Sequence, residues 1–112
     1  MPVYLVETYL VGKNRAKKYT ALMRRIHRSL RKHSDEIPEL VSYKTSTAGM
    51  KGSKSRFVEV SEFTDLVGER KFIGRFAETK WLGTLGRVFH QIVREPTSAI
   101  WGEFLKGARF VR

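Results

Sequence analysis

Acidic, basic and aromatic residues recur at alternate positions of the segments that read as β-strands. Glu7 and Tyr9 are two residues apart in VYLVETYLV, and Glu59 lies in RFVEVSEF. Side chains two residues apart in a strand point to the same face of the sheet. Carboxyl groups enclosed on such a face have pKa values shifted towards neutrality and can act as general acids or bases. We therefore predict one sheet face carrying the catalytic candidates Glu7, Tyr9 and Glu59, with a ligand pocket made of Lys44, Ser61, Phe63, Trp101 and Glu103.

The same alternation is also compatible with a purely structural role. These residues could be exposed at sheet edges or form ion pairs in a dimer interface, because strand parity does not show that side chains converge. The more uniformly apolar alternate positions suit packing against helices. The polar set is therefore expected on the sheet face that points away from the helices.

Metal and cofactor sites are not predicted. The chain has no cysteine, and its three histidines, His27, His33 and His90, lack the spacing of metal ligands. There is no phosphate-binding glycine loop, dinucleotide fingerprint or serine nucleophile elbow. Whether the chain is an enzyme is left open by the residues alone.

The predicted elements follow one another as strand, helix, strand, strand, helical region, strand. Strands are expected over residues 3–11, 40–45, 56–63 and 97–105, and helices over residues 14–33 and 66–93, the second in two segments. A glycine- and serine-rich stretch over residues 47–55 is expected to be a mobile hairpin loop. This order predicts a single α+β domain over residues 1–112 with the ferredoxin-like β-α-β-β-α-β arrangement, an antiparallel four-stranded sheet and helices on one face. The bare sheet face is expected to be covered by a second copy, giving a dimeric α/β barrel.

The segments VYLVETYLV, LVSYKTSTAG, RFVEVSEFTD and SAIWGEFL, with an amphipathic helix after the first, resemble the dimeric α/β-barrel superfamily. The resemblance is to its NIPSNAP-type and antibiotic-biosynthesis-monooxygenase-type domains. It implies a homodimer that binds small hydrophobic or aromatic molecules, with cofactor-independent monooxygenase or isomerase activity in some members. Haem-degrading members use an asparagine, a tryptophan and a histidine where this chain has Glu7, Phe63 and no histidine, so haem chemistry is not expected.

A strongly basic helix supports an alternative function. No acidic residue occurs between Glu7 and Asp35, and the whole chain has a formal net charge of +11. A helical wheel places the row Lys17, Arg24, Arg28 and Arg31 opposite the apolar arc. This row could bind a nucleic acid or an acidic partner protein.

An RNA-recognition-type domain would have the same order of elements, but its match to this chain is incomplete. Phe57-Val58 echoes part of the aromatic motif of the third strand in that class, whereas the glycines expected before it are absent. No run of about 18 apolar residues and no basic leader segment occurs, so a cytoplasmic protein that does not enter membranes is expected.

Overall fold

The computed structural model describes residues 2–101, with side chains described as far as Ser98. Glu103, the side chain of Trp101 and the end of the predicted fourth strand lie outside the described residues. The elements are β1 (Val3–Val11), α1 (Ala16–Lys32), β2 (Leu40–Lys51), β3 (Lys54–Phe63), α2 (Leu66–Glu78), α3 (Lys80–Ile92) and β4 (Arg94–Trp101), with short 3-10 turns at Lys13–Arg15 and Ser34–Glu36.

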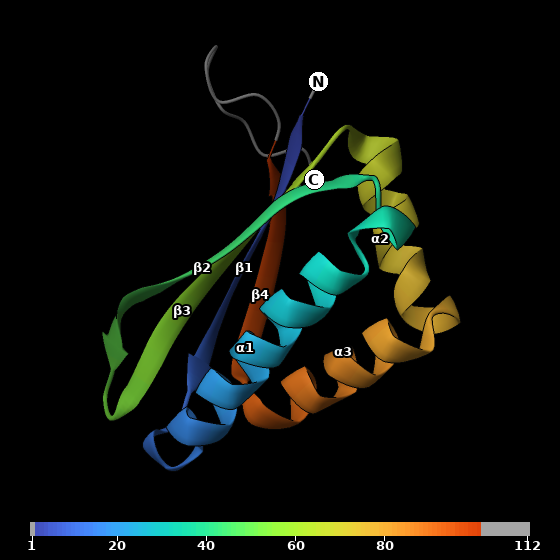
Figure 1. Cartoon of the computed structure of the whole chain (residues 1–112). Coiled ribbons are helices and arrows are strands. Elements are labelled where there is room, and N and C mark those ends of the chain that lie inside the picture. Colours follow the sequence, from blue (N-terminus) through green and yellow to red (C-terminus); the bar gives the residue numbers. More distant parts are fainter. Residues whose placement is uncertain (1, 102–112) are drawn as a thin grey trace.

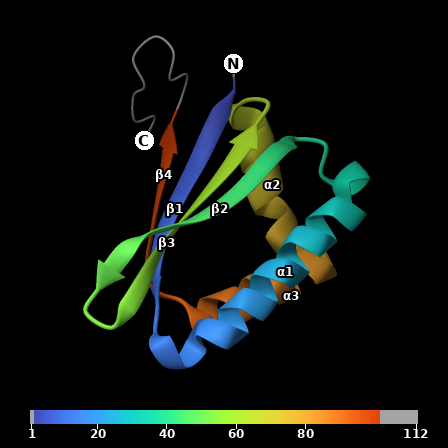
Figure 2. The same ribbon diagram turned by 60° about the vertical axis from the view of Figure 1, so that its left-hand side comes forward.

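The four strands form one antiparallel sheet in the order β2-β3-β1-β4. All three helices cover the same face of this sheet, as Figures 1 and 2 show from two directions. The predicted α+β, ferredoxin-like architecture is therefore confirmed. The second helical region is divided at Thr79, whose extended backbone separates α2 from α3.

The hairpin between β2 and β3 differs from the prediction. The stretch over residues 47–55 was expected to be a loop, but β2 continues to Lys51 and β3 begins at Lys54. The reversal is confined to a tight turn in which Gly52 has a φ of 62°, a conformation that favours glycine. Pairing of the two arms satisfies the backbone hydrogen-bonding groups that a loop would leave to water.

The core consists of two apolar clusters between the sheet and the helices. One contains Tyr9 from β1 with Tyr19 and Leu22 from α1, and the other contains Phe63 from β3 with Phe72 from α2. These contacts fix which sheet face is covered, because Tyr9 and Phe63 belong to the alternate positions that point towards the helices. The outward face carries the other alternate positions.

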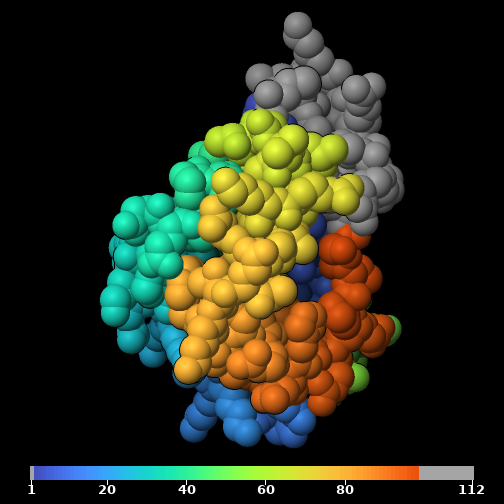
Figure 3. Space-filling model, turned by 90° about the vertical axis from the view of Figure 1, so that its right-hand side faces the viewer, coloured from blue at the N-terminus to red at the C-terminus, as the bar shows by residue number. Residues whose placement is uncertain are grey.

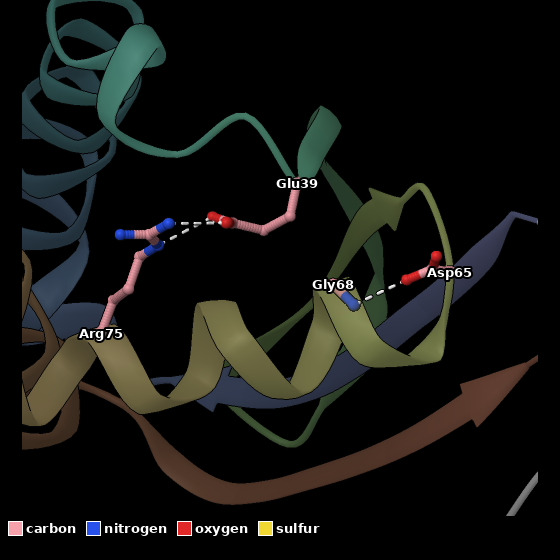
Figure 4. A network of polar contacts seen from close by, with 4 residues as sticks. All are labelled: Glu39, Asp65, Gly68 and Arg75. Carbon is pink, nitrogen blue, oxygen red and sulfur yellow. Dashed lines mark hydrogen bonds and ion pairs between the residues drawn. The ribbon is translucent and has the colours of Figure 1, made fainter.

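An ion pair ties α2 to the segment that leads into β2. The guanidinium of Arg75 donates to both carboxylate oxygens of Glu39, from Nη2 at 2.8 Å and from Nε at 3.0 Å (Figure 4). Glu39 is buried, so this two-point contact compensates the loss of its hydration. At the other end of α2, the Asp65 side chain accepts from the Gly68 amide at 2.7 Å and caps the helix.

Two glycines of the helical region are expected to respond in opposite ways to alanine. A Cβ at Gly83 on α3 would lie 2.7 Å from the backbone oxygen of Phe76, whereas a Cβ at Gly74 on α2 would have nothing within 4 Å. We expect Gly83→Ala to lower the free energy of unfolding by about 1–3 kcal/mol, since the helices must move apart. We expect Gly74→Ala to raise it by up to about 1 kcal/mol through helix propensity. Urea unfolding of both variants checks this, and equal effects at the two positions would contradict the close packing of α2 on α3.

Candidate ligand-binding site

A cavity of about 640 Å³ lies between the sheet and the helices. Its lining includes Leu5, Glu7, Glu59 and Ser61 from the sheet, Ile26 and Leu30 from α1, Tyr43 from β2, Phe72, Ile73 and Phe76 from α2, and residues of α3 from Leu82 to Gln91. Figure 3 shows a hollow between α2, α3 and β4 in which the dark blue atoms of β1 are visible. We call the exposed part of the lining, formed by Ile73, Phe76, Arg87, His90 and Gln91, the cavity mouth. Most of the wall is apolar, so polar groups on it are conspicuous.

Two carboxyl groups lie next to each other on the sheet side of the cavity. Glu7 of β1 is directly paired with Glu59 of β3 in the antiparallel register. Side chains of directly opposed residues are separated by about 5 Å at Cβ, so two charged carboxylates there would repel each other. Glu59 is only 5% exposed, while Glu7 is half-buried.

This environment favours the protonated form of Glu59. Burial raises the pKa of Glu59, the nearby Glu7 raises it further, and a hydrogen bond with Tyr9 acts in the opposite direction, giving a pKa of about 8. Burial also raises the pKa of Glu7. At neutral pH the cavity therefore presents a neutral carboxylic acid that can donate a proton or a hydrogen bond, and at slightly alkaline pH a carboxylate that can accept one.

Tyr9 lies behind Glu59 and is fully buried. Its hydroxyl is 2.6 Å from that of Tyr19 on α1, and its ring makes an edge contact with Phe89. Burial, and then the Glu59 carboxylate, raise the pKa of Tyr9, and burial raises the pKa of Tyr19 to about 12. Both phenols are therefore neutral hydrogen-bonding groups, and Tyr9 acts on the cavity through Glu59.

The structure brings together part of the residue set predicted from the sequence. Glu7, Glu59 and Ser61 line the cavity. Phe63 is completely buried behind the wall, with its ring centroid 5.3 Å from that of Phe72. Trp101 and Glu103 are not placed, because the side chain of the first and all of the second lie outside the described residues.

The predicted orientation of the sheet was wrong. Glu7, Tyr9 and Glu59 were expected on the face away from the helices, but they point towards them. The outward alternate positions include Val6 and Val60, which are apolar and resemble a core face in sequence. Period-two alternation separates the two faces without showing which one the helices cover.

Lys44 was predicted to belong to the pocket, but it does not line the cavity. The register between β2 and β3 shifts by one residue between Leu40 and Ser42. This irregularity places Lys44 opposite Val60 on the outward face and puts Tyr43 opposite Ser61 on the cavity side. An extra residue in one strand turns every following side chain to the opposite face of the sheet. No residue type in this segment predicts the irregularity.

Sequence reasoning missed the contribution of α2 and α3 to the cavity. Leu82, Leu85 and Phe89 repeat at helical spacing, which predicts an apolar helical face but does not show that this face borders an open space. Gly83 and Gly86 were the available signal. A Cβ at Gly86 would lie 3.1 Å from the ring of Phe76, so this glycine lets an aromatic side chain of α2 pack closely on α3 beside the cavity.

The basic row of α1 lies away from this site. Lys17, Arg24, Arg28 and Arg31 are exposed, whereas Tyr19, Leu22 and Met23 of the same helix are buried. Among the described residues, none of the four makes an ion pair. The described part of the chain also holds no cluster of side chains suited to a metal ion, and none of its helices is long and apolar enough to cross a membrane.

The chain is a ferredoxin-like α+β domain with a cavity between the sheet and the helices. No family model matches the sequence, and neither does any curated protein sequence. Solved structures with the same fold are nevertheless similar over almost the whole chain. The predicted resemblance to the dimeric α/β-barrel superfamily is confirmed at the level of the fold.

Three of these structures illustrate the similarity. SnoaB from Streptomyces nogalater, described as a cofactor-independent oxygenase, has a TM-score of 0.66 and 12% identity, with 92% of this chain and 93% of that chain covered. A NIPSNAP family protein from Agrobacterium tumefaciens has a TM-score of 0.65 and 13% identity, with 89% and 90% covered. A dimeric ferredoxin-like protein of unknown function from Thermobifida fusca has a TM-score of 0.63 and 12% identity, with 92% of each chain covered.

Proposed function

We propose that this chain is a small-molecule-binding protein whose ligand occupies the cavity between the sheet and the helices. The observation that carries the proposal is the pairing of Glu7 with Glu59 inside a mainly apolar space of about 640 Å³. Ligand sites are usually cavities of roughly 300–1,000 Å³ with apolar walls and a few polar groups. Burying two carboxyl groups lowers the stability of the fold. A ligand that contacts them would account for their presence in the cavity.

The chemistry that this arrangement supports is proton transfer at a weakly acidic C–H or O–H group. The Glu59 carboxylate takes the proton and becomes a carboxylic acid, and the electron pair remains on the ligand as an enolate, phenolate or carbanion. Return of the same proton to another atom completes an isomerisation. Attack of the carbanion on O₂ at a CH₂ group, followed by loss of water, leaves C=O and completes a monooxygenation.

The comparison structures do not distinguish between these two reactions. A cofactor-independent oxygenase shares the fold at 12% identity, and the proton-transfer step is common to both reactions. We therefore propose binding with proton transfer by Glu59 as the function, with monooxygenation and isomerisation as its two outcomes. The exposed basic row of α1 is distant from this chemistry and has no observation favouring a nucleic-acid partner beyond its charge.

We further propose that the protein is a homodimer in which a second copy covers the outward sheet face. Val6 and Val60 are directly paired on this face, next to Thr8 and Val58, so a continuous and mainly apolar strip crosses the two central strands. A strip of this kind is typical of an interface. The similar structure from Thermobifida fusca is described as dimeric.

Narrowing the cavity is expected to weaken ligand binding. Ser61 is a small residue on the wall, so Ser61→Leu places three additional carbon atoms beside the space that a ligand would use. With the neutral probe 2-naphthamide, we expect at least a tenfold loss of affinity by isothermal titration calorimetry. The leucine takes up space that the probe needs, and each CH₂-sized part of the probe kept out of the cavity loses about 0.8 kcal/mol of binding free energy.

The matched control makes the same change on the surface. Ser46 of β2 is exposed and does not line the cavity, so Ser46→Leu should bind 2-naphthamide as the wild type does. Circular dichroism verifies that both variants are folded. Undiminished binding by Ser61→Leu would place the ligand elsewhere and overturn the proposal.

A further inference from the structure

The inference concerns the mouth of the cavity, and it rests on the function proposed above. Arg87 and His90 of α3 both line the cavity and are both exposed. Residues three apart on a helix lie on the same side, so the two side chains border the same stretch of the opening. Gly83 and Gly86 lie on this side of α3 as well, and their lack of side chains leaves room for Phe76 of α2.

Arg87 is available to a ligand. Its Nη2 donates to the hydroxyl of Thr84 at 3.2 Å, and this contact orients the guanidinium without neutralising it. Within the described part of the chain Arg87 makes no ion pair. No residue of α3 is acidic, so its own helix offers no competing carboxylate.

The two ends of the cavity therefore differ in the charge they accept. The sheet side carries the carboxyl groups of Glu7 and Glu59, which offer an anion no positive charge, whereas the mouth carries a guanidinium and an imidazole. An anionic group at the mouth also stays partly hydrated and avoids most of the cost of burying a charge. An arginine matches the geometry of a carboxylate with two parallel hydrogen bonds.

We propose that the ligand is an apolar organic acid, whose carboxylate or similar anionic group contacts Arg87 and His90 at the mouth while its hydrocarbon or aromatic body occupies the cavity. This orientation directs the far end of the ligand towards Glu59. The acidic C–H or O–H group that reacts would then lie at the opposite end of the molecule from its permanent charge.

A matched pair of probes tests the inference. 2-Naphthoate and 2-naphthamide have nearly the same size and shape, and differ in charge. We expect the wild type to bind 2-naphthoate about tenfold more tightly than 2-naphthamide, a preference of the size that one charge-assisted hydrogen bond gives. Arg87→Gln should remove most of this preference by weakening the binding of 2-naphthoate far more than that of 2-naphthamide, and Arg87→Lys should retain part of it.

The control separates a specific contact from the general positive field. Arg24→Gln removes the same charge from the exposed row of α1, so it should leave the preference intact. An equal loss in Arg24→Gln and Arg87→Gln would overturn the inference, as would wild-type protein that binds both probes equally. The second result leaves the proposed function standing, since 2-naphthamide still binds, whereas absence of binding by either probe contradicts the inference and the proposed function together.

Discussion

Glu59→Gln is expected to remove most of a fall in stability that the wild-type protein undergoes between about pH 5 and pH 8. Glu59 has a pKa of about 8 in the folded protein, against an ordinary value of 4.5. Between these two values the folded state holds a proton that the unfolded state has lost. The stabilisation is therefore fully present below pH 4.5 and is lost as the pH rises through 8.

The size of this effect follows from the difference between the two pKa values. One pKa unit corresponds to about 1.4 kcal/mol, so the wild type should lose on the order of several kcal/mol of unfolding free energy over this range. Glutamine has nearly the same shape and does not ionise. Urea unfolding at pH 5, 7 and 8.5 should therefore show a much smaller fall in stability for Glu59→Gln, in which Glu7 alone contributes, than for the wild type.

Glu62→Gln is the matched control for this experiment. Glu62 lies on the same strand but on the outward face, where it accepts a hydrogen bond from Ser42 at 2.9 Å. This variant keeps Glu59 and should show the wild-type fall. A wild-type protein whose stability does not change between pH 5 and 8.5 would contradict the proposed state of the carboxyl pair.

Val60→Lys is expected to convert the proposed dimer into a monomer. Val60 lies at the centre of the outward strip, directly opposite Val6 and next to Lys44 of β2. A lysine here would bring an unpaired charge into the dimer interface, which costs about 3–5 kcal/mol when a charge is buried without a partner. Analytical ultracentrifugation should show a dissociation constant raised by at least about a hundredfold.

The same substitution at an exposed position on a helix provides the comparison. Val67 of α2 is 76% exposed and lies on the helical side of the sheet, so Val67→Lys should remain dimeric. If Val60→Lys dimerises as the wild type does, or if the wild type is monomeric at high concentration, the second copy does not cover this face.

The order and type of the elements could be predicted because local chemistry specifies them. Gly12 ends the first strand and Asp65 caps α2. β4 begins at Arg94, three residues before the predicted start at residue 97, and includes Pro96, which a strand at the edge of the sheet tolerates. Alternation and helical spacing are visible within a few residues. These signals were sufficient for the ferredoxin-like arrangement.

Which face of the sheet the helices cover could not be predicted, because it depends on contacts between distant segments. Leu5 and Val6 are both apolar, and only the packing of the three helices decides which of them is covered. The position of Lys44 depends on an irregularity near Leu40 that has no clear sequence signal. The pairing of Glu7 with Glu59 likewise follows from the register of two strands separated by a helix and a hairpin.

The cavity itself is a product of helix packing. Its volume depends on how closely α2 approaches α3, and that distance is set by Gly83 and Gly86 against Phe76. Arg87 and His90 become relevant only once this space exists. Their spacing in the sequence is that of any two surface residues of a helix.

The most direct test of the central claim is the titration of the carboxyl groups by ¹³C NMR of the glutamate side chains. The carboxyl pair in the cavity predicts one resonance that titrates near pH 8 and is missing from Glu59→Gln. Addition of 2-naphthamide should perturb this resonance, because the ligand would lie against Glu59. Titration of every glutamate below pH 6, with no change on adding the probe, would contradict a protonated carboxyl group at a ligand site.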